Sequence, residues 1–270
     1  MTAQAEALAR FRAEYGAHRA AEGRGAGGVA ELLALPYLAE GPTASQWAIR
    51  SRTYDAFERR VLRPMARAAG RPLRLLDLGA GNGWLCYRAS LLGHAATAMD
   101  VRDDAVDGLG AAAGYDPHLP KLFGRVAASF EAIPAADASF DVAVFNAALH
   151  YALDLRAALA EAKRVVRPGG RIVILDSPFY RHEKDGRAMV EEKRRHAAAR
   201  FGGRADALTA LPFIEYLTAD SLAAASAPLG LHWRRHRVRY PLAYEIRPLV
   251  AFVRRRRAPS RFDLWECTVP

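Results

Sequence analysis

Cysteine is scarce in this sequence, because only Cys86 and Cys267 occur among its 270 residues. Two cysteines are too few for a disulfide framework, and neither stands in a CxxC pair or in a cysteine and histidine spacing typical of zinc sites. We therefore expect both to be plain buried thiols in a reducing compartment, and we expect no metal site.

Long apolar runs are also absent. No run approaches the ~20 residues that a membrane-spanning helix requires. Residues 1–24 form an amphipathic pattern of Ala, Glu and Arg without the apolar centre of a signal peptide. These two absences predict a cytoplasmic protein that makes no membrane contact.

Acidic residues are outnumbered, with 29 Asp and Glu against 39 Lys and Arg and a formal net charge of +10. A basic surplus favours nucleic-acid binding where the basic residues cluster. Here the arginines are scattered along the whole chain beside abundant alanine. The densest run, Arg254–Arg257, ends a predicted helix, where cations interact favourably with the helix dipole. Nucleic acid is therefore disfavoured as a partner. We expect a monomer or a homodimer.

Two regions of different pattern follow each other along the chain. Apolar residues at helical spacing between Ser45 and Ala69 predict a helical cap at 1–69, with a flexible joint at Gly23–Gly28. Residues 70–270 then form an α/β domain, and a less regular insert at about 177–228 is expected on the substrate side.

Short β-like runs alternate with helical runs from Leu73 onward, which is typical of a parallel sheet with crossover helices. Right-handed crossovers place the carboxyl ends of the strands at one edge, where such folds bind ligands. The predicted strands are Leu73–Leu78, Ala95–Asp100, Leu122–Ala127, Val142–Asn146 and Arg171–Asp176, followed by an antiparallel edge pair at His232–Tyr240 and Phe262–Val269. The predicted helices are Trp84–Leu92, Asp103–Ala113, Leu155–Val166 (stopped by Pro168-Gly169-Gly170), Glu183–Arg200, Ser221–Ala227 and Ile246–Arg257.

A glycine-rich turn joins the first of these strands to the first of these helices. Its glycines at 79, 81 and 83 allow a tight turn and a close approach to a ligand. The spacing differs from the GxGxxG of dinucleotide-binding proteins, no Walker lysine follows, and an acid precedes the turn at Asp77. This arrangement suits a ligand that carries positive charge and no phosphate.

The segment Asp77-Leu78-Gly79-Ala80-Gly81-Asn82-Gly83 resembles motif I of the class I S-adenosylmethionine-dependent methyltransferases, of the type 11 small-molecule branch. Three further segments follow in the order expected for that family. They are Asp100 at the end of the second strand, the run 128–134 leading into Ser139-Phe140-Asp141-Val142-Ala143, and the turn and strand at 164–174. The resemblance spans about residues 71–180.

The resemblance implies a Rossmann-like seven-stranded sheet, mostly parallel with an antiparallel last strand, and helices on both faces. It also implies S-adenosylmethionine as cofactor and S-adenosylhomocysteine as product. Ser129 stands where the family usually has an aspartate, so its contact with the adenine would be weaker. The cofactor-binding residues that it implies are Asp77, Gly79, Ala80, Gly81 and Asn146 for the methionine end, Asp100 for the ribose, and Val101, Ser129 and Phe130 for the adenine.

Methyl transfer is an in-line displacement that needs orientation above all, and no covalent protein intermediate. For a hydroxyl or amine acceptor a base must remove a proton, and His150, after the fourth strand, is the candidate; the alternative is that it positions the acceptor without proton transfer. Tyr151 is the second candidate catalytic residue. The expected acceptor-binding residues are Tyr180 as a wall and Tyr37, Trp47, Arg50 and Tyr54 as a lid from the cap.

The acceptor is expected to be a small molecule, methylated on oxygen or nitrogen. A nucleic-acid methyltransferase is an alternative supported by charge alone, since no Asn/Asp-Pro-Pro-aromatic turn follows the fourth strand, where the chain has Asn146–Leu149. A non-catalytic S-adenosylmethionine-binding module and a nicotinamide oxidoreductase are further alternatives, and the glycine spacing disfavours the latter.

Overall fold

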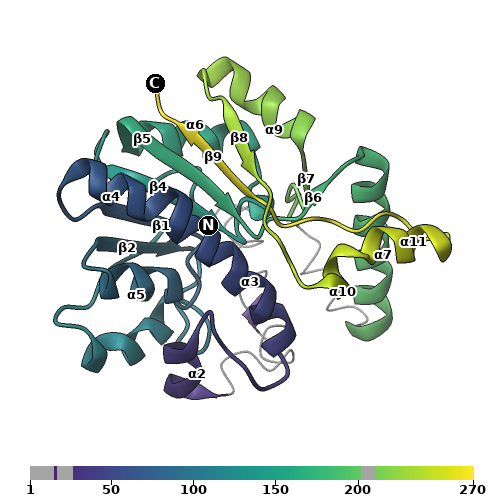
Figure 1. The fold of residues 1–270 in the computed structure, drawn as a ribbon, viewed down its shortest axis with the longest axis horizontal. Helices are drawn as coiled ribbons and strands as arrows, with labels where there is room; N and C mark the ends of the chain where they lie inside the picture. The colour runs from purple at the N-terminus through teal and green to yellow at the C-terminus, as the bar shows by residue number, and fades with distance from the viewer. Residues whose placement is uncertain (1–14, 17–26, 202–210) are drawn as a thin grey trace, which may run out of the picture.

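A seven-stranded sheet forms the centre of the molecule (Figure 1). The computed structural model describes residues 15–16, 27–201 and 211–270. The strand order is β3-β2-β1-β4-β5-β9-β8, and β9 runs antiparallel to both of its neighbours, whereas the other pairs are parallel. This confirms the predicted sheet. The strands are β1 (Arg74–Leu78), β2 (Ala95–Asp100), β3 (Gly124–Ala127), β4 (Phe140–Asn146), β5 (Val166–Leu175), β8 (Trp233–His236) and β9 (Leu264–Thr268).

The sheet is buried on both faces because alternate residues of its inner strands enter two separate cores. In β4, Val142 and Val144 belong to one core, whereas Ala143 and Phe145 belong to the other. The first core is closed by α2 (Gly28–Ala34), α3 (Ala44–Phe57), the π-helical turn η1 (Glu58–Leu62), α4 (Arg63–Ala69), α5 (Trp84–Leu91) and the 3₁₀ segment η2 (Leu109–His118). The second is closed by α6 (Leu155–Val165) and α9 (Ala219–Ser226), with η5 (Ala227–Leu229).

The segment after β5 forms a small second unit at the carboxyl edge of the sheet. Its two short strands, β6 (Phe179–Tyr180) and β7 (Leu217–Thr218), pair in parallel. The long helix α7 (Glu183–Phe201) lies at the same end of the molecule as α10 (Leu242–Glu245) and α11 (Arg247–Val253) (Figure 1). Among the described residues, no helix combines the length and apolarity that crossing a membrane would need.

The helix predicted at Asp103–Ala113 is wrong, because this stretch folds into turns followed by η2. The Asp104 carboxylate accepts hydrogen bonds from the backbone N–H groups of Val106 and Asp107, at 3.1 and 3.0 Å. Such local bonds compete with helix formation. The backbone at Gly108 lies close to that of Asp104. A Cβ added at Gly108 would lie 2.7 Å from the Asp104 nitrogen, so this turn requires glycine.

Helix α6 ends at Val165, one residue before the predicted end at Val166, but β5 begins at Val166 and not at the predicted Arg171. The residues around Gly169 and Gly170 pair with the C-terminal segment: Gly169 N–H donates to the Val269 carbonyl at 2.9 Å, and Val269 N–H donates to Gly170 at 3.0 Å. The helix predicted at 246–257 is shorter, as α11 ends at Val253. Of the joint predicted at 23–28, residues 23–26 lie outside the described part of the chain, as does most of the predicted first helix.

Candidate functional site

A cavity of about 400 Å³ lies at the carboxyl ends of β1, β2 and β4. The turn after β1 and the end of β2 form one side of it, the loops after β3 and β4 another, and α3 covers it. Eleven of the residues proposed for the site from the sequence line it: Trp47, Arg50, Gly79, Ala80, Gly81, Asp100, Val101, Ser129, Phe130, Asn146 and Tyr151.

The glycine turn forms the floor of the cavity. Gly79 has φ +75°, and a Cβ added there would lie 2.3 Å from the Cβ of Ala148, so only glycine fits. The N–H groups of Gly79 and Ala80 both donate to the Met99 carbonyl, at 2.8 and 3.0 Å. The turn therefore offers a ligand close approach to the backbone, while these donors hold the turn against β2.

Asp100 ends β2 beside this turn. Its Oδ2 accepts from the Gly81 N–H and its Oδ1 from the Arg102 N–H, both at 2.8 Å. Burial raises the pKa of the Asp100 carboxyl above its ordinary value, although these two N–H bonds and the charge of Arg102 oppose the shift. A carboxylate has about four lone-pair sites, so two remain for hydroxyl donors of a ligand.

Asp77 lies beneath the turn and does not line the cavity. Its side chain is fully buried, and among the described residues its Oδ1 atom has no hydrogen-bond partner. Burial, with the charge of Asp100, holds the pKa of Asp77 well above its ordinary value, and Arg50 opposes this shift. Such a carboxyl favours a positive charge on the cavity side.

Arg50 brings a cation from α3 to the opposite side of the cavity. Its Nη2 donates to the Asn146 Oδ1 at 3.3 Å, and its Nε lies 3.5 Å from the Oδ2 of Asp176, the residue after β5. Its guanidinium also stands 4.4 Å from the ring centre of Trp47. Burial raises the pKa of Asp176, and the charge of Arg50 opposes this rise.

Ser129 and Glu131 form a polar pair after β3, and both line the cavity. The Ser129 hydroxyl donates to Oε2 of Glu131, whose Oε1 accepts the backbone N–H of Leu153 at 2.7 Å. The Ser129 oxygen also accepts the backbone N–H of Glu131 at 3.3 Å, so one of its lone pairs remains as an acceptor.

Aromatic side chains surround the end of the cavity near η3 (Leu149–Tyr151). The Tyr151 ring makes edge contacts with Tyr15 and Phe213, both at 5.6 Å between ring centres, and its hydroxyl lies 3.1 Å from that of Tyr15. His150 does not line the cavity, and its ring centre lies 4.2 Å from that of Tyr151.

The three remaining lid and wall residues lie away from the cavity lining. Tyr37 is half exposed and donates to Asp55 at 2.8 Å. Tyr54 is buried, and its ring centre lies 5.5 Å from that of Trp84, which does line the cavity. Tyr180 is buried in β6, and its hydroxyl accepts from Arg257 at 3.1 Å. Their proposed contacts with an acceptor would thus be indirect in this conformation.

Several cavity residues were missed by the sequence analysis. Asn82 was quoted within the motif but given no role; its amide oxygen accepts the Trp84 N–H at 3.2 Å at the start of α5. Leu211 and Phe213 belong to an apolar stretch that the pattern shows without indicating a contact. The missed lining residues are Tyr15, Asn82, Trp84, Asp107, Glu131, Ala147, Ala148, Leu153, Leu211 and Phe213, whereas Arg102, expected beside Val101 against the adenine, also lines the cavity. Within the described part of the chain, no group of His, Cys, Asp and Glu is arranged to hold a metal ion.

Comparison with protein families matches residues 76–174, which include the turn, the end of β2 and β4, to the family described as a methyltransferase domain. This chain carries a methyltransferase domain. Its relatives include the malonyl-[acyl-carrier protein] O-methyltransferase of Erwinia pyrifoliae, 36% identical over 38% of this chain and 37% of that protein. They also include the ubiquinone/menaquinone biosynthesis C-methyltransferase UbiE of Methylobacterium nodulans, 33% identical over 46% of this chain and 49% of that protein.

The chain spans between about a third and half the length of these curated relatives. Among solved structures, the YcgJ protein of Bacillus subtilis matches 77% of this chain and 97% of its own, with a TM-score of 0.51 and 16% identity. Geranyl diphosphate methyltransferase matches 74% of this chain and 71% of its own, with a TM-score of 0.51 and 15% identity. At these identities the likeness establishes the fold, a Rossmann-like methyltransferase fold.

Proposed function

We propose that the methyltransferase domain binds S-adenosylmethionine in the cavity and transfers its methyl group to a small-molecule acceptor. The observation that carries the proposal is the joint position of Asp100 and the Gly79–Gly83 turn at one edge of the sheet. A buried carboxylate with free lone pairs suits the two hydroxyls of a ribose. The N–H groups of Gly79, Ala80 and Gly81 already donate to Met99 and Asp100, which suits a ligand that carries no phosphate.

The residues present fit this cofactor. Gly79 leaves a cradle that any Cβ would fill, and the Oδ1 of Asp77 is a buried acceptor without a partner among the described residues. When bound, the cofactor supplies a methyl group activated by a sulfonium. A positive charge above the turn would favour the ionised forms of Asp77 and Asp100, whose pKa values burial raises, and Arg50 with Asn146 would hold the carboxylate of the methionine end.

Ser129 and Glu131 would bind the adenine end. The Glu131 carboxylate accepts the hydrogen bond of the Ser129 hydroxyl, so the Ser129 oxygen would accept a hydrogen bond from the adenine amino group. Through Ser129, Glu131 would therefore supply the negative charge that the family's aspartate would supply directly. Val101 and Phe130 line the same part of the chain's cavity and offer apolar contact.

The chain's own contribution to the reaction is orientation and exclusion of water. Trp47 from α3, with Leu211 and Phe213 from the segment before β7, closes the cavity with apolar side chains. We propose that Tyr151 faces the acceptor and that His150 positions the Tyr151 ring through their contact. An oxygen or nitrogen acceptor is proposed, acted on in the cytoplasm by a monomer or homodimer.

Calorimetry with S-adenosylmethionine, S-adenosylhomocysteine and NADH tests the proposal. We expect saturable binding of the first two and none of NADH. Asp100→Asn should weaken binding by at least about tenfold, because hydrogen bonds to a charged group contribute about 1.5–3 kcal/mol. Asp116→Asn changes an exposed carboxylate outside the cavity and should have no effect. A folded protein that binds neither adenosyl compound would overturn the proposal, and mass-spectrometric detection of a methylated acceptor would separate an enzyme from a binding module.

A further inference from the structure

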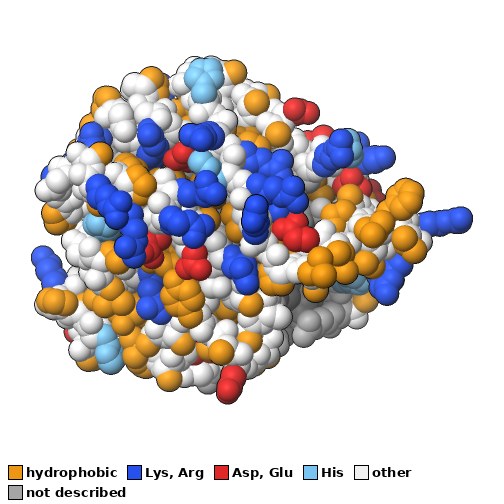
Figure 2. Space-filling view, in the orientation of Figure 1, with side chains coloured by type: hydrophobic (Ala, Val, Ile, Leu, Met, Phe, Trp, Pro, Cys, Tyr) orange, Lys and Arg blue, Asp and Glu red, His pale blue; other side chains and the backbone are white. Residues whose placement is uncertain are grey.

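A second concavity, of about 480 Å³, is lined mainly by arginines and lies apart from the cofactor cavity. We call it the arginine groove. Its two sides are the α3–η1 helix and the segment that follows β8, on the face shown in Figure 2, where many Lys and Arg side chains are exposed. The groove is lined by Arg52, Asp55, Ala56, Arg59, Arg60, Arg237, Val238 and Arg239.

The periodicity of both segments directs these arginines outward together. On the helix, Arg52, Arg59 and Arg60 recur at spacings of seven and eight, which places them on one face, while Phe57 and Val61 are buried on the other. After β8, exposed Arg237 and Arg239 flank buried Val238, which is the alternation of an extended chain. Five arginines thus line one hollow.

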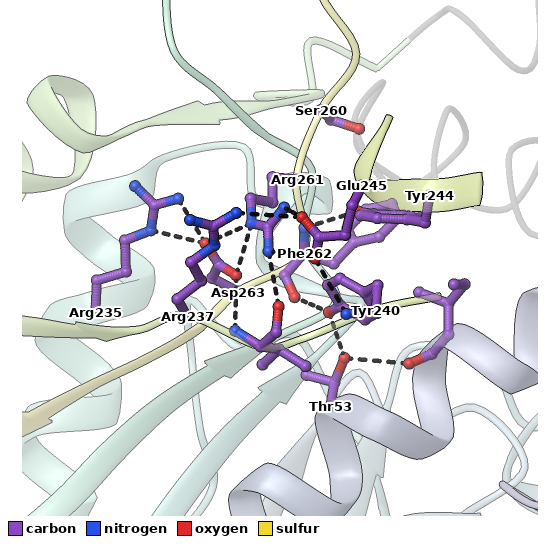
Figure 3. A network of polar contacts seen from close by, with 12 residues as sticks. Thr53, Arg235, Arg237, Tyr240, Tyr244, Glu245, Ser260, Arg261, Phe262 and Asp263 are labelled. Atoms are coloured by element: carbon purple, nitrogen blue, oxygen red, sulfur yellow. Dashed lines mark hydrogen bonds and ion pairs between the residues drawn. The ribbon is translucent and has the colours of Figure 1, made fainter. Parts of the chain in front are cut away.

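The charge in the groove is not balanced by the protein. Among the described residues, Arg52, Arg59, Arg60 and Arg239 make no ion pair, and Asp55, the one acid in the lining, accepts the hydroxyl of Tyr37. In the adjoining polar network, by contrast, Arg235, Arg237 and Arg261 each pair with a carboxylate (Figure 3).

In that neighbouring network every arginine has a carboxylate. Arg235 donates to Asp263 at 2.7 Å, and Arg261 donates to Glu245 at 2.9 Å and to Asp263 at 3.0 Å. Arg237, at the border of the groove, reaches Glu245 at 3.2 Å. The chain therefore pairs the arginines of the network with acids, whereas Arg52, Arg59, Arg60 and Arg239 of the adjoining groove make no ion pair with the described residues.

We propose that the arginine groove binds a small ligand that carries two or more neighbouring phosphate groups. Guanidinium groups bind phosphate through paired N–H donors, and several cations around one hollow concentrate the potential there. The volume lies in the range of small-molecule sites, about 300–1,000 Å³. No aromatic side chain is among its lining residues, so it lacks the stacking platform on which single-stranded nucleic acid binds. The inference is independent of the function proposed for the cofactor cavity, whose ligand has no phosphate.

Calorimetry at constant ionic strength with tripolyphosphate, pyrophosphate, ATP and orthophosphate tests the proposal. We expect tripolyphosphate and pyrophosphate to bind at least ten times more tightly than orthophosphate. If ATP and tripolyphosphate bind with similar affinity, the site recognises polyphosphates in general. If ATP binds clearly more tightly than tripolyphosphate, the site recognises nucleotides.

The variant R59Q/R239Q should lose this binding by at least tenfold. The matched control R156Q/R194Q removes the same charge from exposed arginines of α6 and α7 outside the groove and should bind as the unaltered protein does. Both variants should keep the melting temperature and the S-adenosylhomocysteine affinity of the unaltered protein. Equal loss in the two double variants would overturn the proposal, as would binding of duplex DNA or polyglutamate by a protein that does not bind tripolyphosphate.

Discussion

Arg50 on α3, which lines the cavity, and Asp176, the residue after β5, form an ion pair with 3.5 Å between Nε and Oδ2. Both side chains are largely buried, with exposed fractions of 16% and 5%. The pair therefore joins the cap helix to the sheet at the edge where the cavity opens. Because Arg50 also donates to Asn146, it holds the carboxyl ends of β4 and β5 together.

Removing Arg50 should destabilise the fold. Arg50→Gln leaves the Asp176 carboxylate buried without its cation, and loss of one partner of a buried pair costs about 3–5 kcal/mol in the free energy of unfolding. Asp176→Asn in the same protein should recover part of that loss, because the uncompensated charge is gone. Urea unfolding of the two single variants and the double variant measures this coupling. Strictly additive losses would contradict a direct interaction.

Gly79→Ala should damage the cavity floor through two separable effects. The new Cβ would clash with Ala148, and a non-glycine residue at φ +75° is strained. Gly93→Ala is the matched control, because Gly93 has φ +82° and open space around its Cβ position. We expect Gly93→Ala to lower stability by about 1–2 kcal/mol and to leave S-adenosylhomocysteine binding intact.

The clash itself is tested by adding Ala148→Gly to Gly79→Ala. This second change removes the atom that the new Cβ would meet, so it should restore part of the stability and of the ligand affinity lost in Gly79→Ala. No recovery in melting temperature or calorimetric affinity would show that backbone strain alone accounts for the loss.

Ser129→Ala should weaken recognition of the adenine amino group. A neutral hydrogen bond contributes about 0.5–1.5 kcal/mol, so S-adenosylhomocysteine should bind about 3–10 times more weakly, while its 6-oxo counterpart, S-inosylhomocysteine, should be little affected. Glu131→Gln should give a similar but smaller loss of discrimination. Ser139→Ala, outside the cavity, is the control. Equal losses for the two ligands would argue against an adenine contact at Ser129.

His150→Phe should retain most of kcat, because an aromatic ring at that position can still pack against Tyr151 without exchanging a proton. His150→Ala removes the contact and should lower kcat with little change in the affinity for S-adenosylhomocysteine. The pH profile of kcat in His150→Phe decides the role: an unchanged profile supports positioning. A fall of about 100-fold or more with loss of the acidic limb would identify His150 as a general base instead.

Stability should fall in acid through Glu245. Hydrogen bonds from Arg261, opposed by burial, lower the pKa of Glu245 to about 2, below the value of about 4.3 for an unfolded chain. A depressed carboxyl pKa stabilises the folded state above the unfolded pKa, and this contribution is lost as pH falls from about 4 toward about 2. Glu245→Gln should be less stable at pH 7, by about 1–2 kcal/mol, and should show a flatter decline in acid. Urea midpoints between pH 7 and pH 3 measure both effects.

The sheet could be predicted closely because its information is local. Strand β2 coincides with the predicted Ala95–Asp100, because a short apolar run between a glycine turn and acidic residues can adopt few structures other than a strand. The position of Asp100 beside the turn then follows from parallel pairing of β1 with β2. The stretch after Asp100 could not be predicted from periodicity, because the side chain of Asp104 bonds to the backbone where a helix would otherwise start.

The walls of the cavity depend on contacts that the sequence does not reveal. Leu211 and Phe213 come from a segment far along the chain, and their position depends on how the part after β5 folds back over η3. The roles of His150 and Tyr151 also depend on a detail of geometry. In the 3₁₀ turn η3 neighbouring side chains point in different directions, so Tyr151 lines the cavity and His150 does not.

The place of β9 in the sheet has a consequence for how the chain acquires its structure. Strand β9 lies between β5 and β8, although β8 precedes it in sequence, so β8 has no strand to pair with until Leu264–Thr268 has left the ribosome. Insertion of β9 must come late, and until then the flank of β5 presents unpaired backbone groups. Nascent or partly unfolded molecules would associate through that unpaired edge of β5. Pairing of β9 with β5 therefore protects the protein from aggregation.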